Sequence, residues 1–145
     1  MSSTMQATIL IVQRDPAVRR LLRAALRSEG HETREAPGAF EALMAAAASS
    51  RPIDMLLTDV SLDGIDGFRL AERMGSAFPA MRVVYLTASE QITGPGSHPT
   101  LSLADPALAE AACSLARDIL AAQAPKKKPA TSAGASTETV ARQTA

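Results

Sequence analysis

The sequence predicts one aspartate at the end of a buried strand, a position where α/β proteins often carry catalytic or binding residues. The run Met55-Leu56-Leu57 is typical of a buried parallel strand, apolar on both faces, and Asp59 stands at its end. In an open α/β sheet, ligands and reactions sit at the carboxyl ends of the strands. A carboxylate there can bind a hard cation or act as a nucleophile. The alternative is that Asp59 only caps a loop or the next helix, as Asp commonly does in turns.

The elements that must position Asp59 follow from apolar runs that alternate with helical patterns. The sequence predicts strands at residues 7–12, 31–36, 55–59, 81–86 and 100–103. It predicts helices from Asp15-Pro16 to Gly30, over 38–49 and 67–77, and after Asp105-Pro106. Strands that alternate with helices through short loops form a parallel sheet with helices on both faces.

The stretch from Asp54 to Gly67 resembles the phosphoacceptor strand and loop of response-regulator receiver domains, the CheY-like family. In that family an apolar strand ends in the acceptor Asp, and an Asp-Gly pair opens the third helix. Asp59 matches the acceptor, and Asp66-Gly67 matches the pair. Thr87 matches the family's switch hydroxyl, which hydrogen-bonds the phosphoryl group. The resemblance covers residues 7–88 and implies an α/β fold with a doubly wound five-stranded parallel sheet, flavodoxin- or CheY-like.

The metal site that the resemblance implies departs from the family pattern. Receivers carry two acids directly after the first strand, in a Val-Asp-Asp-Glu-Pro type sequence, and these acids hold Mg²⁺. Aligned on the proline, the acid pair is replaced here by Gln13 and Arg14, while Asp15 falls one position past the metal site and suits a helix cap. One carboxylate and a carbonyl hold Mg²⁺ only weakly. We therefore expect weak or absent Mg²⁺ binding, and no other cofactor.

A second departure concerns the positive charge that receivers place after the fifth strand. The family has a Lys-Pro there, whereas this chain has Leu101-Ser102-Leu103-Ala104, and no Lys occurs before Lys126. The aromatic switch residue of that strand is also absent. Of the five functional positions, Asp59 and Thr87 remain. These losses predict a degenerate receiver with impaired or absent Asp phosphorylation; the alternative is slow but functional phosphorylation of Asp59.

Arg14 suggests a further hypothesis about the altered site. Its guanidinium could lie beside Asp59 and replace the metal as the counter-charge of that carboxylate. The alternative is that Arg14 points to solvent. In the following helix, Arg19, Arg20 and the two arginines after them form either a docking patch or an ordinary solvated face.

Two further predictions concern single side chains and one helix face. His31 is expected at the surface, because no Cys or second His at ligand spacing accompanies it. Phe40, Leu43, Met44 and Ala47 recur at helical spacing and form an apolar stripe that predicts a helix over residues 38–49.

The domain organisation follows from changes in composition. Residues 1–6 are predicted to be loose, 7–124 to form the receiver-like domain, and 125–145 to be a disordered basic and polar tail. Residues 88–100 are rich in Gly and Pro, so we expect a loop in place of the fourth helix. The tail is short and polar, which predicts a stand-alone receiver without an output domain.

Composition narrows the function further. Three Phe, one Tyr and no Trp argue against nucleic-acid binding by base stacking, and Lys126-Lys127-Lys128 would add little affinity. A small α/β enzyme is a remote alternative, because no second catalytic group accompanies Asp59. No signal peptide or membrane span is apparent, so a cytoplasmic protein is expected. The expected partners in bacterial two-component or phosphorelay signalling are a histidine kinase, a phosphotransfer protein or a downstream effector, with a homodimer possible.

Overall fold

The computed structural model describes residues 6–88 and 98–123. The chain falls into two compact units, residues 1–114 and 115–145, and the sheet belongs to the first. Most of the predicted loop at 88–100 and all of the predicted tail from 125 lie outside the described residues. The predicted boundaries at 6/7 and 124/125 therefore remain predictions.

Five strands form one parallel sheet. They are β1 (Thr8–Val12), β2 (Glu32–Ala36), β3 (Met55–Asp59), β4 (Arg82–Thr87) and β5 (Thr100–Ser102). Their order across the sheet is β2-β1-β3-β4-β5, and every neighbouring pair is parallel. β1 and β3 are buried along their whole length, as strands in the middle of a parallel sheet must be.

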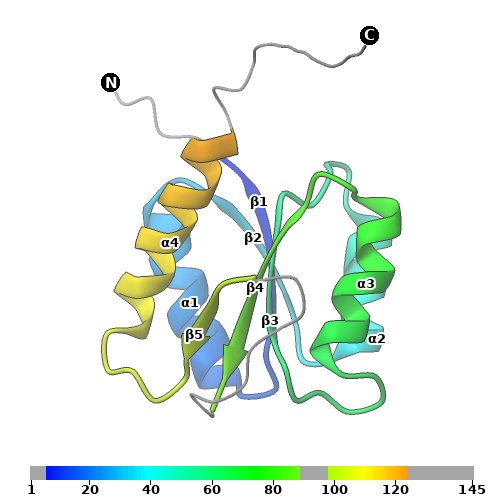
Figure 1. Ribbon diagram of the computed structural model, residues 1–145, viewed down its shortest axis with the longest axis horizontal. Helices are drawn as coiled ribbons and strands as arrows, with labels where there is room; N and C mark the ends of the chain where they lie inside the picture. Colours follow the sequence, from blue (N-terminus) through cyan, green and yellow to red (C-terminus); the bar gives the residue numbers. More distant parts are fainter. Residues whose placement is uncertain (1–5, 89–97, 124–145) are drawn as a thin grey trace, which may run out of the picture. The chain divides into compact units, whose positions relative to one another are not determined.

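The helices lie on both faces of the sheet. They are α1 (Pro16–Ser28), α2 (Ala39–Ala48), α3 (Gly67–Ala77) and α4 (Leu108–Gln123), the last of which runs from the first unit into the second. Figure 1 shows α1 on one face and both α2 and α3 on the other. This arrangement confirms the predicted doubly wound α/β fold. Among the described helices, none is long and apolar enough to cross a membrane.

The helix starts are set by short-range chemistry that the sequence displays. Asp15 is the N-cap of α1, and its Oδ1 accepts a hydrogen bond from the Ala17 amide at 2.9 Å. Asp66 caps α3 in the same way, because its Oδ1 accepts from the Arg69 amide at 2.8 Å. Each cap satisfies an amide that the first helical turn leaves without a partner.

The face of α2 that packs against the sheet consists of small side chains. Its buried side chains are three alanines, Ala39, Ala42 and Ala46, whereas Phe40 is 70% exposed and Met44 is 56% exposed. The apolar stripe at helical spacing therefore indicates the helix but does not mark its buried face. The helix is apolar on nearly every side, so periodicity alone could not identify the inner face, and small alanines allow the helix to lie close to the sheet.

His31 differs from the prediction, because it is buried rather than at the surface. Its Nδ1 accepts a hydrogen bond from the Ala7 amide at 3.2 Å, just before β1 begins. Burial lowers the pKa of His31 below its ordinary 6.5, and the nearby charge of Glu29 opposes that shift without overcoming it. The neutral imidazole is thus a structural acceptor at the start of the central strand.

We expect this burial to make stability depend on pH. Below pH 6.5 the unfolded chain binds a proton at His31 that the folded chain, with its lowered pKa, does not bind. The free energy of unfolding should therefore be highest above that pH and decrease as the pH falls toward the folded pKa. Urea unfolding from about pH 7.5 to 5 measures the trend. In a His31→Gln variant the slope over this interval should flatten; an unchanged slope would contradict the role of His31.

Candidate functional site

Three strands bring the candidate residues to one edge of the sheet. Asp59 is the last residue of β3 and is only 6% exposed. Val12 of β1 is in register with Thr58, so Gln13 follows at the same edge as Asp59. Asp59 is itself in register with Leu86, which places Thr87 one residue farther along β4.

The carboxylate of Asp59 is held by its own loop. Its Oδ1 accepts a hydrogen bond from the Ser61 amide at 2.9 Å. The backbone carbonyl of Asp59 accepts from the Thr58 hydroxyl at 3.0 Å. The loop then closes on itself, because the Gly67 amide donates to the Val60 carbonyl at 2.9 Å. The strand end and its carboxylate are therefore fixed by local bonds.

Gly67 makes the closest contact of this site. A Cβ atom on Gly67 would lie 2.2 Å from the carbonyl oxygen of Asp59 and 3.1 Å from the Cα of Val60. Real Cβ atoms essentially never come within 3.0 Å of another atom, so the 2.2 Å approach means that the start of α3 can lie on the end of β3 only if residue 67 has no side chain. The Asp-Gly pair seen in the sequence thus has two physical roles: the aspartate caps the helix, and the glycine permits its contact with the strand.

A Gly67→Ala substitution should force the start of α3 away from β3. We expect a loss of about 1–3 kcal/mol in the free energy of unfolding, as for other overpacked buried sites. Gly75→Ala in the same helix is the matched control, because a Cβ there meets no atom within 4 Å. The control should be neutral or stabilise by up to about 1 kcal/mol. Equal effects of the two substitutions in urea unfolding would show that the close contact does not matter.

Thr87 occupies the buried end of β4. It is 4% exposed, is in register with Ser102 of β5, and its carbonyl accepts a hydrogen bond from the Leu103 amide at 2.9 Å. Thr87 therefore lies between the strand of Asp59 and the short edge strand. The residues that follow β5, Leu103 and Ala104, carry no charge at the place where the family resemblance implies a lysine.

Gln13 and Asp15 are both engaged in the loop between β1 and α1. Gln13 is 4% exposed, and its Oε1 accepts a hydrogen bond from the Asp15 amide at 3.1 Å. Its Nε2 is buried and has no hydrogen-bond partner among the described residues. Asp15 is exposed and turns its carboxylate to the start of α1.

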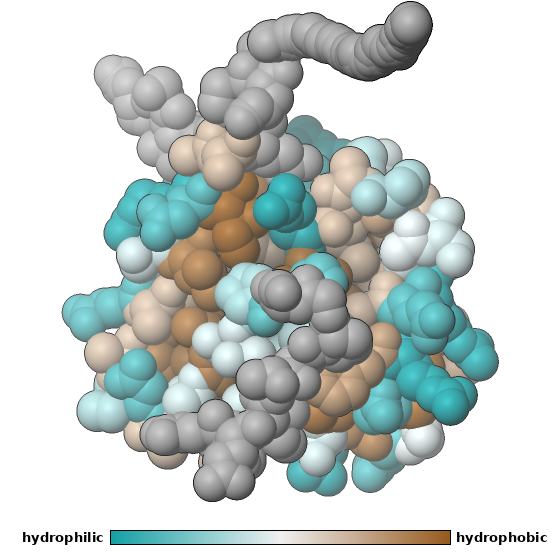
Figure 2. Space-filling model, viewed as in Figure 1, coloured by the Kyte–Doolittle hydropathy of each residue, from teal (hydrophilic) through white to brown (hydrophobic). Residues whose placement is uncertain are grey.

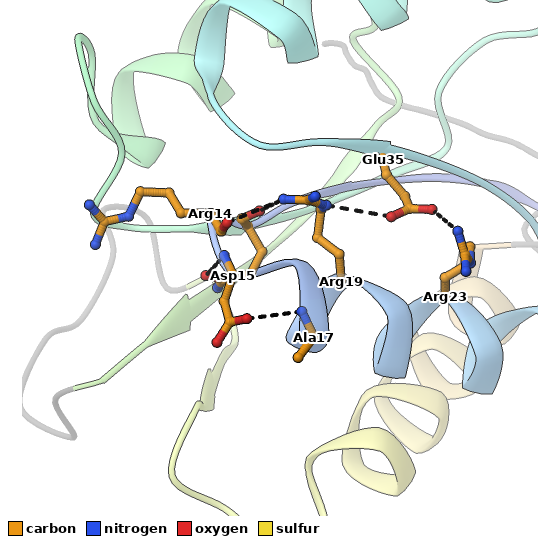
Figure 3. A network of polar contacts seen from close by, with 7 residues as sticks. Arg14, Asp15, Ala17, Arg19, Arg23 and Glu35 are labelled. Atoms are coloured by element: carbon orange, nitrogen blue, oxygen red, sulfur yellow. Dashed lines mark hydrogen bonds and ion pairs between the residues drawn. The ribbon is translucent and has the colours of Figure 1, made fainter.

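The Arg14 side chain does not lie beside Asp59, as the counter-charge hypothesis required. Its Nη1 lies 3.8 Å from Oδ1 of Asp63, and the two side chains are 55% and 94% exposed. Figure 3 shows the side chain extending away from α1. Among the described residues no ion pair joins Arg14 to Asp59, so the hypothesis that Arg14 replaces the metal is wrong. An ion pair this exposed adds little to stability.

A network of ion pairs and hydrogen bonds connects the loop between β1 and α1 to β2. It was not predicted from the sequence. Glu35 accepts from Arg23 at 2.5 Å and lies 3.5 Å from the guanidinium of Arg19. Arg19 also donates to the carbonyl of Gln13 at 2.7 Å. In Figure 3 both arginines turn from α1 toward Glu35. Two of the four arginines proposed as a docking patch thus have a structural partner, while Arg20 remains exposed.

The side chains at these strand ends do not fit Mg²⁺. The ion needs several oxygen ligands in near-octahedral geometry. Asp59 offers one carboxylate, the amide oxygen of Gln13 is already bonded, and the Asp15 carboxylate caps α1. Within residues 6–88 and 98–123, no group of three or more His, Cys, Asp or Glu residues could hold a metal.

A hollow of about 630 Å³ lies beside β4 and was not anticipated. It is lined by Phe68 and Arg69 of α3, by Tyr85 of β4 and by His98, among others. The Tyr85 ring contacts the Phe68 ring edge-on, with centroids 4.7 Å apart. Burial, reinforced by the charge of Asp66, raises the pKa of the Tyr85 hydroxyl. No sequence motif marks this hollow, because its lining comes from separate elements.

Comparison with known proteins identifies the family. Residues 9–94 match the model of the response regulator receiver domain. The transcriptional regulatory protein GlrR of Escherichia coli is 31% identical over 86 residues, which are 59% of this chain and 19% of that protein. Sporulation initiation phosphotransferase F of Bacillus subtilis is 33% identical over 84 residues, 58% of this chain and 66% of that protein. The chain thus spans less than a fifth of the length of GlrR.

A solved structure shows the same fold. The putative response regulator from Chloroflexus aurantiacus is 29% identical and superposes with a TM-score of 0.69, covering 81% of this chain and 99% of that one. The topology, the aspartate at the end of β3 and the family match agree with one another. The chain therefore belongs to the response regulator receiver domain family of two-component signalling.

Proposed function

We propose that this chain is an atypical receiver that acts by binding partner proteins, with Mg²⁺-dependent phosphorylation of Asp59 impaired or absent. The observation that carries the proposal is the set of side chains at the strand ends. Asp59 lies buried at the end of β3, but Gln13 and Arg14 stand where receivers carry metal-binding acids. The acid pair and the lysine that would hold a metal and offset the charge of a transferring phosphoryl group are thus replaced here by Gln13, Arg14 and the uncharged residues that follow β5.

The second candidate function is a slow but functional phosphoacceptor. It is favoured by the placement of Asp59 and Thr87 at the ends of adjacent strands, with the backbone of the acceptor loop held by Gly67. The backbone of such a site is intact even though its charges are altered. A small α/β enzyme has no such support.

The partners we propose are signalling proteins of the same pathway class: a histidine kinase, a phosphotransfer protein or a downstream effector. Membership of the receiver family supports this, since receivers interact with kinases and phosphotransfer proteins. The proposal includes action in the cytoplasm and assigns no catalytic reaction to the chain itself.

Intact mass after incubation with a small-molecule phosphodonor and Mg²⁺ tests the proposal. We expect the unaltered protein to remain at its unmodified mass. A single phosphoryl increment that disappears in Asp59→Asn would contradict the proposal and establish the second candidate.

A matched variant tests the stated cause. Restoring both acids with Gln13→Asp and Arg14→Asp should produce Mg²⁺-dependent modification of Asp59, or at least a gain over the unaltered chain. If the restored protein binds Mg²⁺ and still shows no increment, the missing acids are not sufficient to explain the loss, and the absent lysine becomes the cause to test.

A further inference from the structure

The outer side of α2 carries an apolar surface that the receiver function does not use. Phe40 and Met44 are one turn apart and are 70% and 56% exposed, and the exposed Ala47 and Ala48 continue the same side. Glu41 is the only charged residue of the helix. These five residues are called the α2 face below.

The α2 face differs from the outer faces of the neighbouring helices. The exposed side of α3 carries Arg69, Glu72 and Arg73, and Figure 2 shows mostly hydrophilic side chains on the side of the molecule that α3 forms. Single exposed apolar residues are ordinary, and Leu21 on α1 is one, at 48%. A helix that is apolar on nearly all sides is instead typical of one covered on both sides.

We propose that the α2 face binds the α2 face of a second copy of this chain, with the two helices antiparallel. A two-fold axis at Met44 brings Phe40 of one copy over Ala48 of the other, because these residues lie four positions on either side of Met44. A large side chain then faces a small one at both ends, which allows helices to pack at the usual 8–10 Å. The surface is thus self-complementary, as a two-fold interface requires.

The charges at the two ends of α2 fit the same arrangement. Glu41 lies in the first turn, and the exposed Arg51 follows three residues after the helix ends. An antiparallel pair brings Arg51 of each copy toward Glu41 of the other, at a hollow of about 400 Å³ lined by Glu41 and Asp63 among others. A parallel pair would place the two Glu41 side chains together. Exposed ion pairs contribute little free energy, but they select the orientation.

The apolar area of the α2 face limits the affinity between two copies of the chain. The exposed parts of Phe40 and Met44 amount to roughly 250 Å² per chain on typical side-chain areas. Even with the alanines, two copies bury well under the ~1,200 Å² of stable interfaces. The dimer is therefore weak and reversible, and its population depends on protein concentration.

Sedimentation of the full chain from about 10 µM to 1 mM, the range suited to a small interface, tests the proposal. We expect the average mass to rise from one chain toward two. Phe40→Ser with Met44→Ser should keep the protein monomeric throughout; both residues are exposed, so the fold should be unaffected. Leu21→Ser, an exposed apolar residue on α1, is the matched control and should leave the rise unchanged.

A charge exchange tests the antiparallel orientation separately. Glu41→Arg and Arg51→Glu should each weaken the dimer, and the double variant should restore it. A monomer at every concentration would overturn the proposal, as would a dimer that the α2 substitutions do not affect. Failure of the double variant to recover would overturn the antiparallel pairing. None of these measurements involves phosphorylation, so they stand apart from the proposed function.

Discussion

The close contact between Gly67 and the carbonyl of Asp59 is the constraint on which the rest of the site depends. It allows α3 to begin directly against the end of β3, where any side chain would collide with backbone. The Asp66 cap and the Gly67–Val60 hydrogen bond then close the loop that holds the Asp59 carboxylate. These contacts involve backbone atoms, one helix cap and the bond from the Ser61 amide to the Asp59 carboxylate.

Backbone contacts of this kind hold the strand end in place whichever side chains stand at the ends of the neighbouring strands. The loop after β1 is held by bonds that need no acid at positions 13 and 14: the Gln13 side chain accepts from the Asp15 amide, and Arg19, positioned by its ion pair with Glu35, donates to the Gln13 carbonyl. In this arrangement Gln13 and Arg14 do not need to be acids for the loop to keep its shape.

Much of the fold could be predicted from the sequence, because it depends on local signals. The buried runs of β1 and β3, the cap at Asp15 and the family's Asp-Gly pair at residues 66–67 identified the elements, and the position of Asp59 followed from the end of its strand. The inner face of α2 could not be predicted, since a helix with apolar residues on nearly all sides has no period that distinguishes the face toward the sheet. Phe40 and Met44 belong to the apolar stripe of the sequence, yet both are exposed in the structure.

The contacts of single charged or titratable side chains could not be predicted from the sequence either. His31 accepts a hydrogen bond from the Ala7 amide, 24 positions away, and Arg19 of α1 pairs with Glu35 of β2, while Arg14 reaches Asp63 in the loop after β3. Such contacts depend on which elements become neighbours, and no pattern within one segment records them. The hypothesis about Arg14 failed for this reason.

The most direct measurement is a Mg²⁺ titration followed by the backbone amide NMR signals of Asp59, Ser61 and the loop after β1. If Gln13 and Arg14 prevent Mg²⁺ binding, the natural protein should show no saturable change in these signals at millimolar Mg²⁺. The Gln13→Asp, Arg14→Asp variant should show a saturable change. A saturable, localised change around Asp59 in the unaltered chain would contradict the account and show that this edge of the sheet is a working metal site.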